Sequence, residues 1–355
     1  MSLSGTRGLI RVSKNPECEL QAAMALERVR EPEFYQRVTG QGYPGEYGER
    51  LSARRRGAKF ESNLNRNNAA LLRRALAARF AFDPEEMWVR NFGEEIPGPP
   101  SEMRAMRLHR TRLIVRDLAA GKPVPHLLIQ PQLRLRTGAG QRDFEHVSPD
   151  FLVMDPSIQM YIAGEEKSFI ARAGVAEPGD LDLTRRQAGA GIVALREEAQ
   201  RAGIGDRVSN RALFIVATPY GLSPADPVEE VLDAEVHEVE KAVAVLARVR
   251  QRLQQIRGVD QPPLELVMDD LTVHFQEGCI GSCILASVCQ ERFMGQALLL
   301  GDHAAELVGP ETDPARLVAL ARGALPRDAQ ERAIAYRLNQ AAAVLQHVPR
   351  ALGAR

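Results

Sequence analysis

Apolar and polar positions alternate along residues 148–170 in a way that predicts two short strands joined by a turn. Polar residues nevertheless occupy strand positions at the open end of this hairpin. Asp150 opens the first strand, and Glu165 and Lys167 lie near the end of the second. Since side chains alternate between the faces of a strand, Glu165 and Lys167 share one face and Glu166 takes the other. The pattern therefore predicts that carboxylates and an ammonium group converge there.

The segments around this hairpin predict an alternation of helices and strands. A long helical pattern covers residues 51–80, and residues 126–138 alternate as a half-buried strand should. After the hairpin, a helix is expected from Thr184, and residues 213–217 form a continuous apolar run typical of a buried strand. This order predicts an α/β fold.

Other segments predict additions to that core. A loop rich in Pro, Gly and acids and a following helix form a helical insert at about 83–120, and residues 227–257 form a long amphipathic helix. That helix is an interaction arm or packs against the domain. Residues 262–275 read as one or two strands. We expect one domain over 1–295 and a C-terminal helical appendage over 296–355.

Charge is balanced over the whole chain and clustered near its start. Among the 355 residues, 46 Lys and Arg balance 46 Asp and Glu, so no global field recruits nucleic acid. Residues 1–80 carry 15 basic residues against eight acidic ones. The densest basic run consists of Arg54, Arg55, Arg56 and Lys59. This run is either an exposed helix face or a nucleic-acid-binding surface.

The hydropathy of the chain predicts a cytoplasmic protein that does not enter a membrane. No stretch reaches the roughly 18 apolar residues that a membrane span requires, and the N-terminus lacks the apolar core of a signal peptide. Disulfides are rare in the cytosol, so metal binding or reactivity is the leading explanation for the four cysteines.

Three of those cysteines are close together in the sequence. Cys279, Cys283 and Cys289 are separated by three and then five residues, and Cys18 is the only other cysteine. Thiolates are ligands of iron–sulfur clusters and of tetrahedral zinc, and either site needs a fourth ligand. Zinc sites usually come as paired C-x-x-C hooks, whereas apolar neighbours shield an iron–sulfur cluster. The apolar neighbours here are Ile284, Leu285 and Val288. An iron–sulfur cluster is therefore favoured, with zinc as the alternative.

The polar end of the hairpin has the residues for metal-assisted hydrolysis. Carboxylate oxygens bind Mg²⁺ or Mn²⁺, and a lysine beside the metal can orient water or stabilise an oxyanion. Pro149-Asp150 followed by Glu165-x-Lys167 resembles the PD-(D/E)XK nuclease motif. The alternative interpretation is a surface hairpin with a solvated Glu-Lys pair.

Two helical segments resemble motifs of RecB-like nucleases. Gly57, Phe60 and Glu61 match the G-x-x-F-E element that precedes the nuclease strands in those enzymes. Gln187 matches the glutamine of the Q-x-x-x-Y motif in the helix after the hairpin, but Gly191 occupies the place of the tyrosine. In the family this ring contacts nucleic acid or packs beside the site. The departure puts substrate handling in question.

The division of the cysteines, one before this core and three after it, resembles the iron–sulfur nucleases. That family includes the CRISPR-associated RecB-like exonucleases and the nuclease domain of AddB, in which the cluster staples the two ends of the domain. The first two cysteines of the triplet are usually two residues apart in the family, not three as here.

The resemblance implies a restriction-endonuclease-like (PD-(D/E)XK) core with a mixed central sheet flanked by helices. It implies a DNA exonuclease that acts on single strands or ends, in a repair complex or in CRISPR-type defence. The implied Mg²⁺ or Mn²⁺ ligands are Glu61, Asp150, Glu165 and the carbonyl of Glu166, and the catalytic residues are Asp150, Glu165, Lys167 and Gln187. The implied DNA contacts are Arg56, Lys59, Arg185 and Arg186. A structural 4Fe–4S cluster is implied on Cys18, Cys279, Cys283 and Cys289.

Two alternatives remain open. A non-catalytic DNA-binding or scaffold subunit of a nuclease complex could keep this fold and the cluster, although the intact acid, acid and lysine set argues against it. A zinc-stapled endonuclease would use the same cysteines with a different metal.

Overall fold

The computed structural model describes residues 6–43, 51–140, 143–170, 178–217, 224, 226–280, 282–292, 308 and 313–352. The chain forms two compact units, Met1–Phe34 with Pro44–Leu271 and Tyr35–Tyr43 with Thr272–Arg355. The division falls at Leu271, before the cysteine triplet, whereas the sequence predicts a boundary near 295. None of the described helices is long and apolar enough to cross a membrane.

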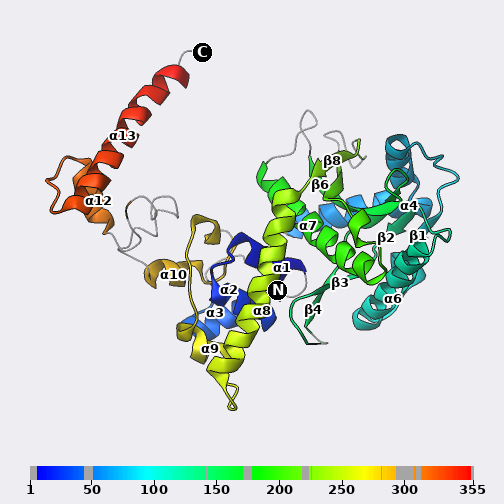
Figure 1. Cartoon of the computed structure of the whole chain (residues 1–355), viewed down its shortest axis with the longest axis horizontal. Coiled ribbons are helices and arrows are strands. Elements are labelled where there is room, and N and C mark those ends of the chain that lie inside the picture. Colours follow the sequence, from blue (N-terminus) through cyan, green and yellow to red (C-terminus); the bar gives the residue numbers. More distant parts are fainter. Residues whose placement is uncertain are drawn as a thin grey trace. The chain divides into compact units, whose positions relative to one another are not determined.

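The first unit is built around a mixed, open sheet of six strands (Figure 1). Its strands are β1 (Val89–Asn91), β2 (Leu127–Ile129), β5 (Phe151–Asp155), β6 (Met160–Ile170), β7 (Arg211–Ala217) and β8 (Val228–Val231), in the spatial order β1-β2-β5-β6-β7-β8. The pairs β1–β2 and β6–β7 are parallel and the others antiparallel. The predicted α/β protein with a mixed sheet flanked by helices is confirmed.

The predicted hairpin is formed by β5 and β6. Phe151 lies opposite Gly164, and a Cβ atom on Gly164 would be 2.0 Å from the Phe151 ring. Glycine at this position therefore lets the ring lie across β6. At the turn, Asp155 Oδ1 accepts the Ser157 N–H at 2.8 Å, as aspartate often does in turns.

One face of the sheet is covered by α4 (Leu51–Phe80), as predicted, although its backbone leaves helical geometry at Arg66–Ala69. Its side chains form a buried cluster with those of β2, β5, β6 and β7. The fully buried members from this helix include Phe60, Leu64, Leu72 and Leu76. Burial of each such side chain stabilises the fold by about 1.5–3 kcal/mol.

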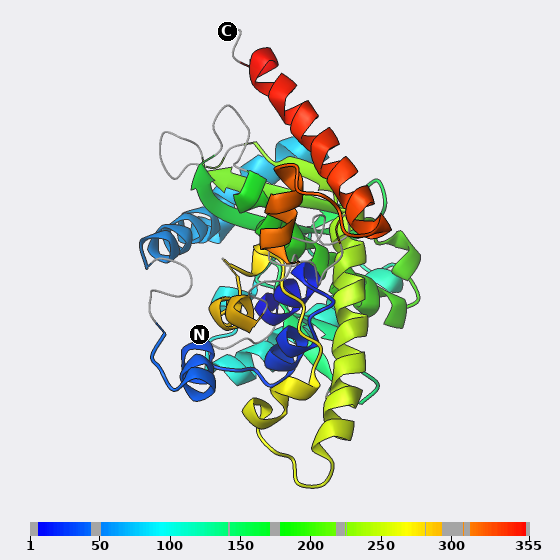
Figure 2. The same cartoon turned by 90° about the vertical axis from the view of Figure 1, so that its left-hand side faces the viewer.

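The other face is covered by α7 (Pro178–Arg201), which connects the parallel strands β6 and β7 and begins before the predicted Thr184. On its outer side it packs against α8 (Asp233–Arg257) and α1 (Thr6–Lys14). Both α1 and α2 (Glu19–Leu26) lie along α8 in the two views (Figures 1 and 2). The long amphipathic helix is thus packed against the unit that carries the sheet, preceded by β8.

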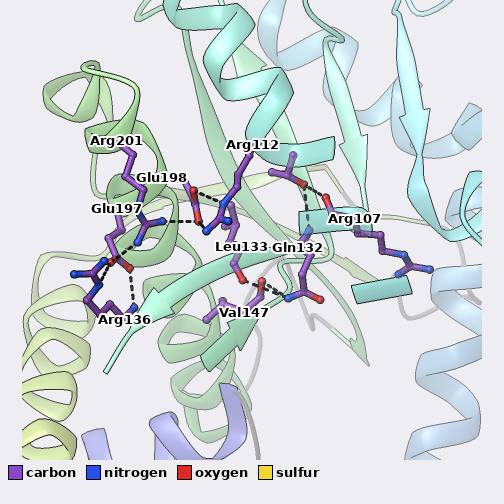
Figure 3. A network of polar contacts seen from close by, with 10 residues as sticks. Arg107, Arg112, Gln132, Leu133, Arg136, Val147, Glu197, Glu198 and Arg201 are labelled. Carbon is purple, nitrogen blue, oxygen red and sulfur yellow. Dashed lines mark hydrogen bonds and ion pairs between the residues drawn. The ribbon is translucent and has the colours of Figure 1, made fainter. Parts of the chain in front are cut away.

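A second sheet of two strands, β3 (Leu133–Arg136) and β4 (Phe144–Val147), packs against α7 and against α6 (Pro100–Ala119). The Gln132 side chain donates to the carbonyl of Val147 at 2.8 Å (Figure 3). The segment 126–138 therefore contributes two strands, β2 and β3, which join different sheets, where the sequence predicts one.

Two sequence predictions need correction. The insert at 83–120 contains α6, but it also holds β1 and the short helix α5 (Phe92–Glu95), which the sequence does not predict. The strands predicted over 262–275 are wrong, because the segment forms α9 (Leu264–Val267) and a 3-10 turn at Met268–Asp270. Proline favours the start of a helix, and a short apolar run cannot distinguish helix from strand.

The second unit is helical wherever the structure assigns it secondary structure. Its elements include a 3-10 turn at Glu277–Cys279, α10 (Ala286–Arg292), α12 (Pro314–Ala321) and α13 (Ala329–Leu352), and α3 (Glu31–Thr39) enters it from the first unit. Leu317 and Leu320 of α12 pack with Ile334 of α13, and Arg316 pairs with Glu331 at 2.5 Å. The helices predicted in the C-terminal segment are confirmed.

Candidate catalytic site

The open end of the β5–β6 hairpin brings Asp150, Glu165 and Lys167 into contact. Asp150 directly precedes β5, and the strand register sets it opposite Glu165. Its Oδ2 atom accepts the N–H of Glu166 at 2.7 Å and a hydrogen bond from Lys167 Nζ at 3.0 Å. Lys167 Nζ also donates to Glu165 Oε2 at 2.7 Å. The three side chains of the predicted motif therefore form one polar cluster.

The side chains divide between the two faces of β6, as the alternation predicts. Glu165 and Lys167 share the face that α7 covers, and Glu166 points toward α4. There Asn65 donates to Glu166 Oε2 at 3.2 Å. Asn65 is not among the site residues predicted from the sequence, although it follows Glu61 by four residues and therefore lies on the same face of the helix.

The G-x-x-F-E element packs α4 against β6. A Cβ atom on Gly57 would be 3.8 Å from Ser168 Oγ, so the helix comes close to the strand at this residue. Phe60 is fully buried in the core under the sheet. Glu61 follows and is near enough to Glu166 to act on its charge. The element thus positions Glu61 beside one of the predicted acids.

Burial and like charges make Glu165 and Glu166 hard to ionise. Burial, together with the negative charge of Asp150, raises the pKa of Glu165 to about 8, against the opposing charge of Lys167. Burial and the charges of Asp150 and Glu61 raise the pKa of Glu166 well above its usual range. Burial alone would lower the pKa of Lys167, but the two carboxylates beside it raise it. Lys167 is therefore the cation that holds the cluster together.

The donor set of this cluster suits a hard divalent cation. In the described part of the chain, no group of three or more His, Cys, Asp or Glu has the arrangement of a metal site. The Oε1 atom of Glu166, however, is buried and accepts no hydrogen bond. A cation that prefers oxygen ligands would satisfy this atom and reduce the repulsion between Asp150, Glu165 and Glu166.

The departure from the Q-x-x-x-Y motif has a steric reason. A Cβ atom on Gly191 would be 3.1 Å from Pro149 Cγ and 3.5 Å from Ala163 Cβ. The helix α7 thus packs directly on the proline before Asp150, and any side chain at this position would require Pro149 or the helix to shift slightly. Gln187 is half-buried one turn earlier on the same face of α7, the face turned toward the hairpin.

The four predicted DNA contacts have different surroundings. Arg56 and Lys59 are exposed on α4 and form no ion pair with any residue that the structure describes. Arg185 makes a two-pronged ion pair with Glu230, at 2.5 and 3.0 Å. Arg186 pairs with Asp182 and with Glu238. Neighbouring acids therefore neutralise the positive charges of Arg185 and Arg186. The exposed residues Arg56 and Lys59 are the better candidates for DNA contacts.

The cysteines of the triplet pack in one apolar cluster of the second unit. Cys279 is buried there with Phe275 and Ala286, and Cys283 and Cys289 pack against them. Cys18 is buried at the N-terminal cap of α2 in the first unit, and all four thiols are free of disulfides. The common ligand set of four cysteines stays a prediction, since the two units are described separately.

Comparison with known proteins adds no family assignment. No protein-family model matches the chain. Neither the curated proteins nor the solved structures gave a match. The function must therefore be inferred from the geometry of the site itself.

Proposed function

We propose that the chain is a metal-dependent DNA nuclease of the PD-(D/E)XK type with a RecB-like, restriction-endonuclease-like core. The observation that carries the proposal is the contact of Lys167 with both Asp150 and Glu165 at the open end of one hairpin. The order of α4, the strand with Asp150 and the strand with Glu165 and Lys167 also supports it. By family analogy, the enzyme is an exonuclease for single strands or DNA ends in repair or CRISPR-type defence.

The residues have distinct roles in this proposal. Asp150 and Glu165 would hold a Mg²⁺ or Mn²⁺ ion, and Glu61 and Glu166, through its backbone carbonyl or its unsatisfied Oε1 atom, would be further ligands. The bound ion supplies Lewis-acid activation of the phosphodiester and of the attacking water. Lys167 orients that water or stabilises the negative charge that develops on the phosphate. Gln187 assists from the adjacent face of α7, and Arg56 and Lys59 contact backbone phosphates.

The proposal is tested by a cleavage assay on an end-labelled single-stranded oligodeoxynucleotide with Mg²⁺ or Mn²⁺. Asp150→Asn and Lys167→Ala should each reduce the cleavage rate at least about 100-fold, because each removes a group that acts on the transition state. Asp117→Asn is the matched control, since Asp117 is a half-exposed acid of α6 that forms an ion pair with Lys122.

Circular dichroism and DNA binding should be similar for the wild type and all three variants. Cleavage that survives Asp150→Asn contradicts the proposed site. A wild type that binds DNA without cleaving it favours the non-catalytic subunit instead.

We also propose that Cys279, Cys283 and Cys289, with Cys18 as the fourth ligand, bind a 4Fe–4S cluster that has a structural role. The packing of the three thiols around Phe275 and Ala286 supports a shielded cluster. Closing so long a loop would restrict the unfolded chain.

Metal content tests this second proposal. Anaerobically purified protein should contain iron and sulfide in equal amounts and absorb visible light, and Cys283→Ser should lose both. Met268→Leu is a control that leaves every thiol in place. Zinc without iron supports the zinc-stapled alternative, and protein with neither metal contradicts both.

A further inference from the structure

A cavity of about 400 Å³ lies between α6, β3 and α7 in the first unit. Its polar lining side chains, apart from Glu198, are His109, Arg112, Arg116, Arg134, Arg136 and Arg201. Five of these are arginines, contributed by two helices and a strand that lie apart in the sequence. A volume of this size is in the range of ligand-binding pockets.

Two glutamates of α7 contact three of these arginines, Arg112, Arg136 and Arg201 (Figure 3). The Glu198 side chain is only 2% exposed and accepts two hydrogen bonds from Arg112, both at 2.9 Å. It also pairs with Arg201 at 2.7 Å. Glu197 accepts the backbone N–H of Arg136 at 2.7 Å and pairs with Arg201 at 2.8 Å. The guanidinium groups of Arg112 and Arg201 are therefore held in place by acids of the fold.

The glutamates do not balance the charge of the cavity. Five arginines and the two glutamates give a net charge of about +3 at neutral pH, since neither residue type titrates there. Burial, and the positive charges of Arg112, Arg201 and Arg136, lower the pKa of Arg134. Arg116 is exposed and forms no ion pair with the described part of the chain. A bound anion would relieve this repulsion.

We propose that the cavity binds phosphate groups of a nucleic-acid strand whose end is cleaved at the hairpin site. The planar guanidinium group of an arginine can donate two parallel hydrogen bonds to two oxygens of one phosphate. The Cζ atom of Arg134 lies 3.9 Å from the centroid of the Phe144 ring, and this stacking fixes the orientation of one guanidinium group. The proposal rests on the proposed nuclease function. It adds a second contact for the strand, remote from the catalytic residues.

The geometry of α7 sets the length of strand that this contact requires. Gln187 beside the hairpin and Glu198 in the cavity are 11 residues apart on one helix, which corresponds to about 16 Å along its axis. At about 3.4 Å per nucleotide, the spacing along one strand of a duplex, about five nucleotides cover this length, and an extended single strand covers it with fewer. A strand of about two nucleotides is too short to contact both sites in either form.

The test measures binding by fluorescence anisotropy in the Asp150→Asn background, with oligodeoxynucleotides of about 2 and about 20 nucleotides. These lengths lie on either side of the minimum estimated above. The double variant Arg116→Gln with Arg136→Gln should weaken binding of the longer strand about 10-fold and reduce its salt slope by about 1 to 2. Binding of the shorter strand should change less. Arg110→Gln is the matched control, since Arg110 is exposed on α6 and does not line the cavity.

Inorganic pyrophosphate serves as a probe for a small ligand. Unchanged affinity and salt slope for the longer strand overturn the proposal, and loss of pyrophosphate binding alone would assign the cavity to a small phosphorylated compound. A failure of the nuclease proposal is distinguishable, because it appears as missing Asp150-dependent cleavage whatever the binding result.

Discussion

The two ends of the β5–β6 hairpin hold buried carboxylates in opposite electrostatic surroundings. At the turn, Asp155 accepts hydrogen bonds from the Ser157 N–H and hydroxyl at 2.8 and 2.6 Å, and it pairs with Arg211 at 2.9 Å. At the open end, Asp150 and Glu165 share the single ammonium group of Lys167. The turn thus supplies several donors to one acid, whereas at the open end two acids share one cation.

Asp155 and Glu165 are each 3% exposed, and burial acts to raise the pKa of both carboxyls. For Asp155, the hydrogen bonds from Ser157 and the charge of Arg211 outweigh burial and lower the pKa. For Glu165, burial and the charge of Asp150 act in the same direction, and the pKa rises to about 8. The partners therefore reverse the effect of burial at Asp155 and add to it at Glu165.

This contrast indicates which end of the hairpin is built for chemistry. An acid whose charge is satisfied by the fold stabilises the fold, whereas acids that repel one another inside it are tolerated where they serve a function. The turn is a structural element by this criterion, and the open end is the candidate site.

The first prediction concerns the turn. Asp155→Asn should lower the free energy of unfolding by about 1–3 kcal/mol at pH 7, because the charge-assisted hydrogen bonds with Ser157 and Arg211 are lost. The wild-type carboxylate contributes this stability fully above its pKa in the unfolded chain, which is about 4. The contribution disappears as the pH falls through the lower pKa of the folded protein.

Urea denaturation between pH 3 and pH 7 measures this effect. The difference between wild type and variant should shrink toward the acidic limit. Asp117→Asn on α6 is the control and should change stability by less than about 0.5 kcal/mol, because Asp117 is 41% exposed. A difference for Asp155→Asn that is constant with pH contradicts the role of its charge.

The hairpin and its polar end could be predicted from the sequence because both depend on local patterns. Strand alternation alone assigns Glu165 and Lys167 to one face and Glu166 to the other, and the structure confirms this division. The Asp155 turn is equally local. The mutual contact of Asp150 and Lys167 follows from the register, which the hairpin fixes.

Features that depend on packing between distant segments could not be predicted. The contact of Gly191 with Pro149 explains a missing tyrosine, but it requires the position of α7 on the sheet. The arginine-lined cavity needs α6, β3 and α7 together. Its only local signals are the spacing of Arg112 and Arg116 by four residues in a helix and of two strand arginines by two.

The second prediction reverses the sign at the open end. The pKa of Glu165 is about 4.5 in the unfolded chain and about 8 in the folded protein. At a pH between these two values, folded Glu165 keeps a proton that the unfolded chain releases. Its contribution to stability therefore falls as the pH rises through this range. Glu165→Gln cannot ionise and escapes the loss, so in EDTA its free energy of unfolding relative to wild type should rise by about 1 kcal/mol for each pH unit between pH 5 and pH 8. Parallel pH profiles would show that Glu165 is already ionised in the folded protein.

Mg²⁺ added at pH 8 should stabilise the wild type more than the variant, because only the wild type offers the full set of carboxylates.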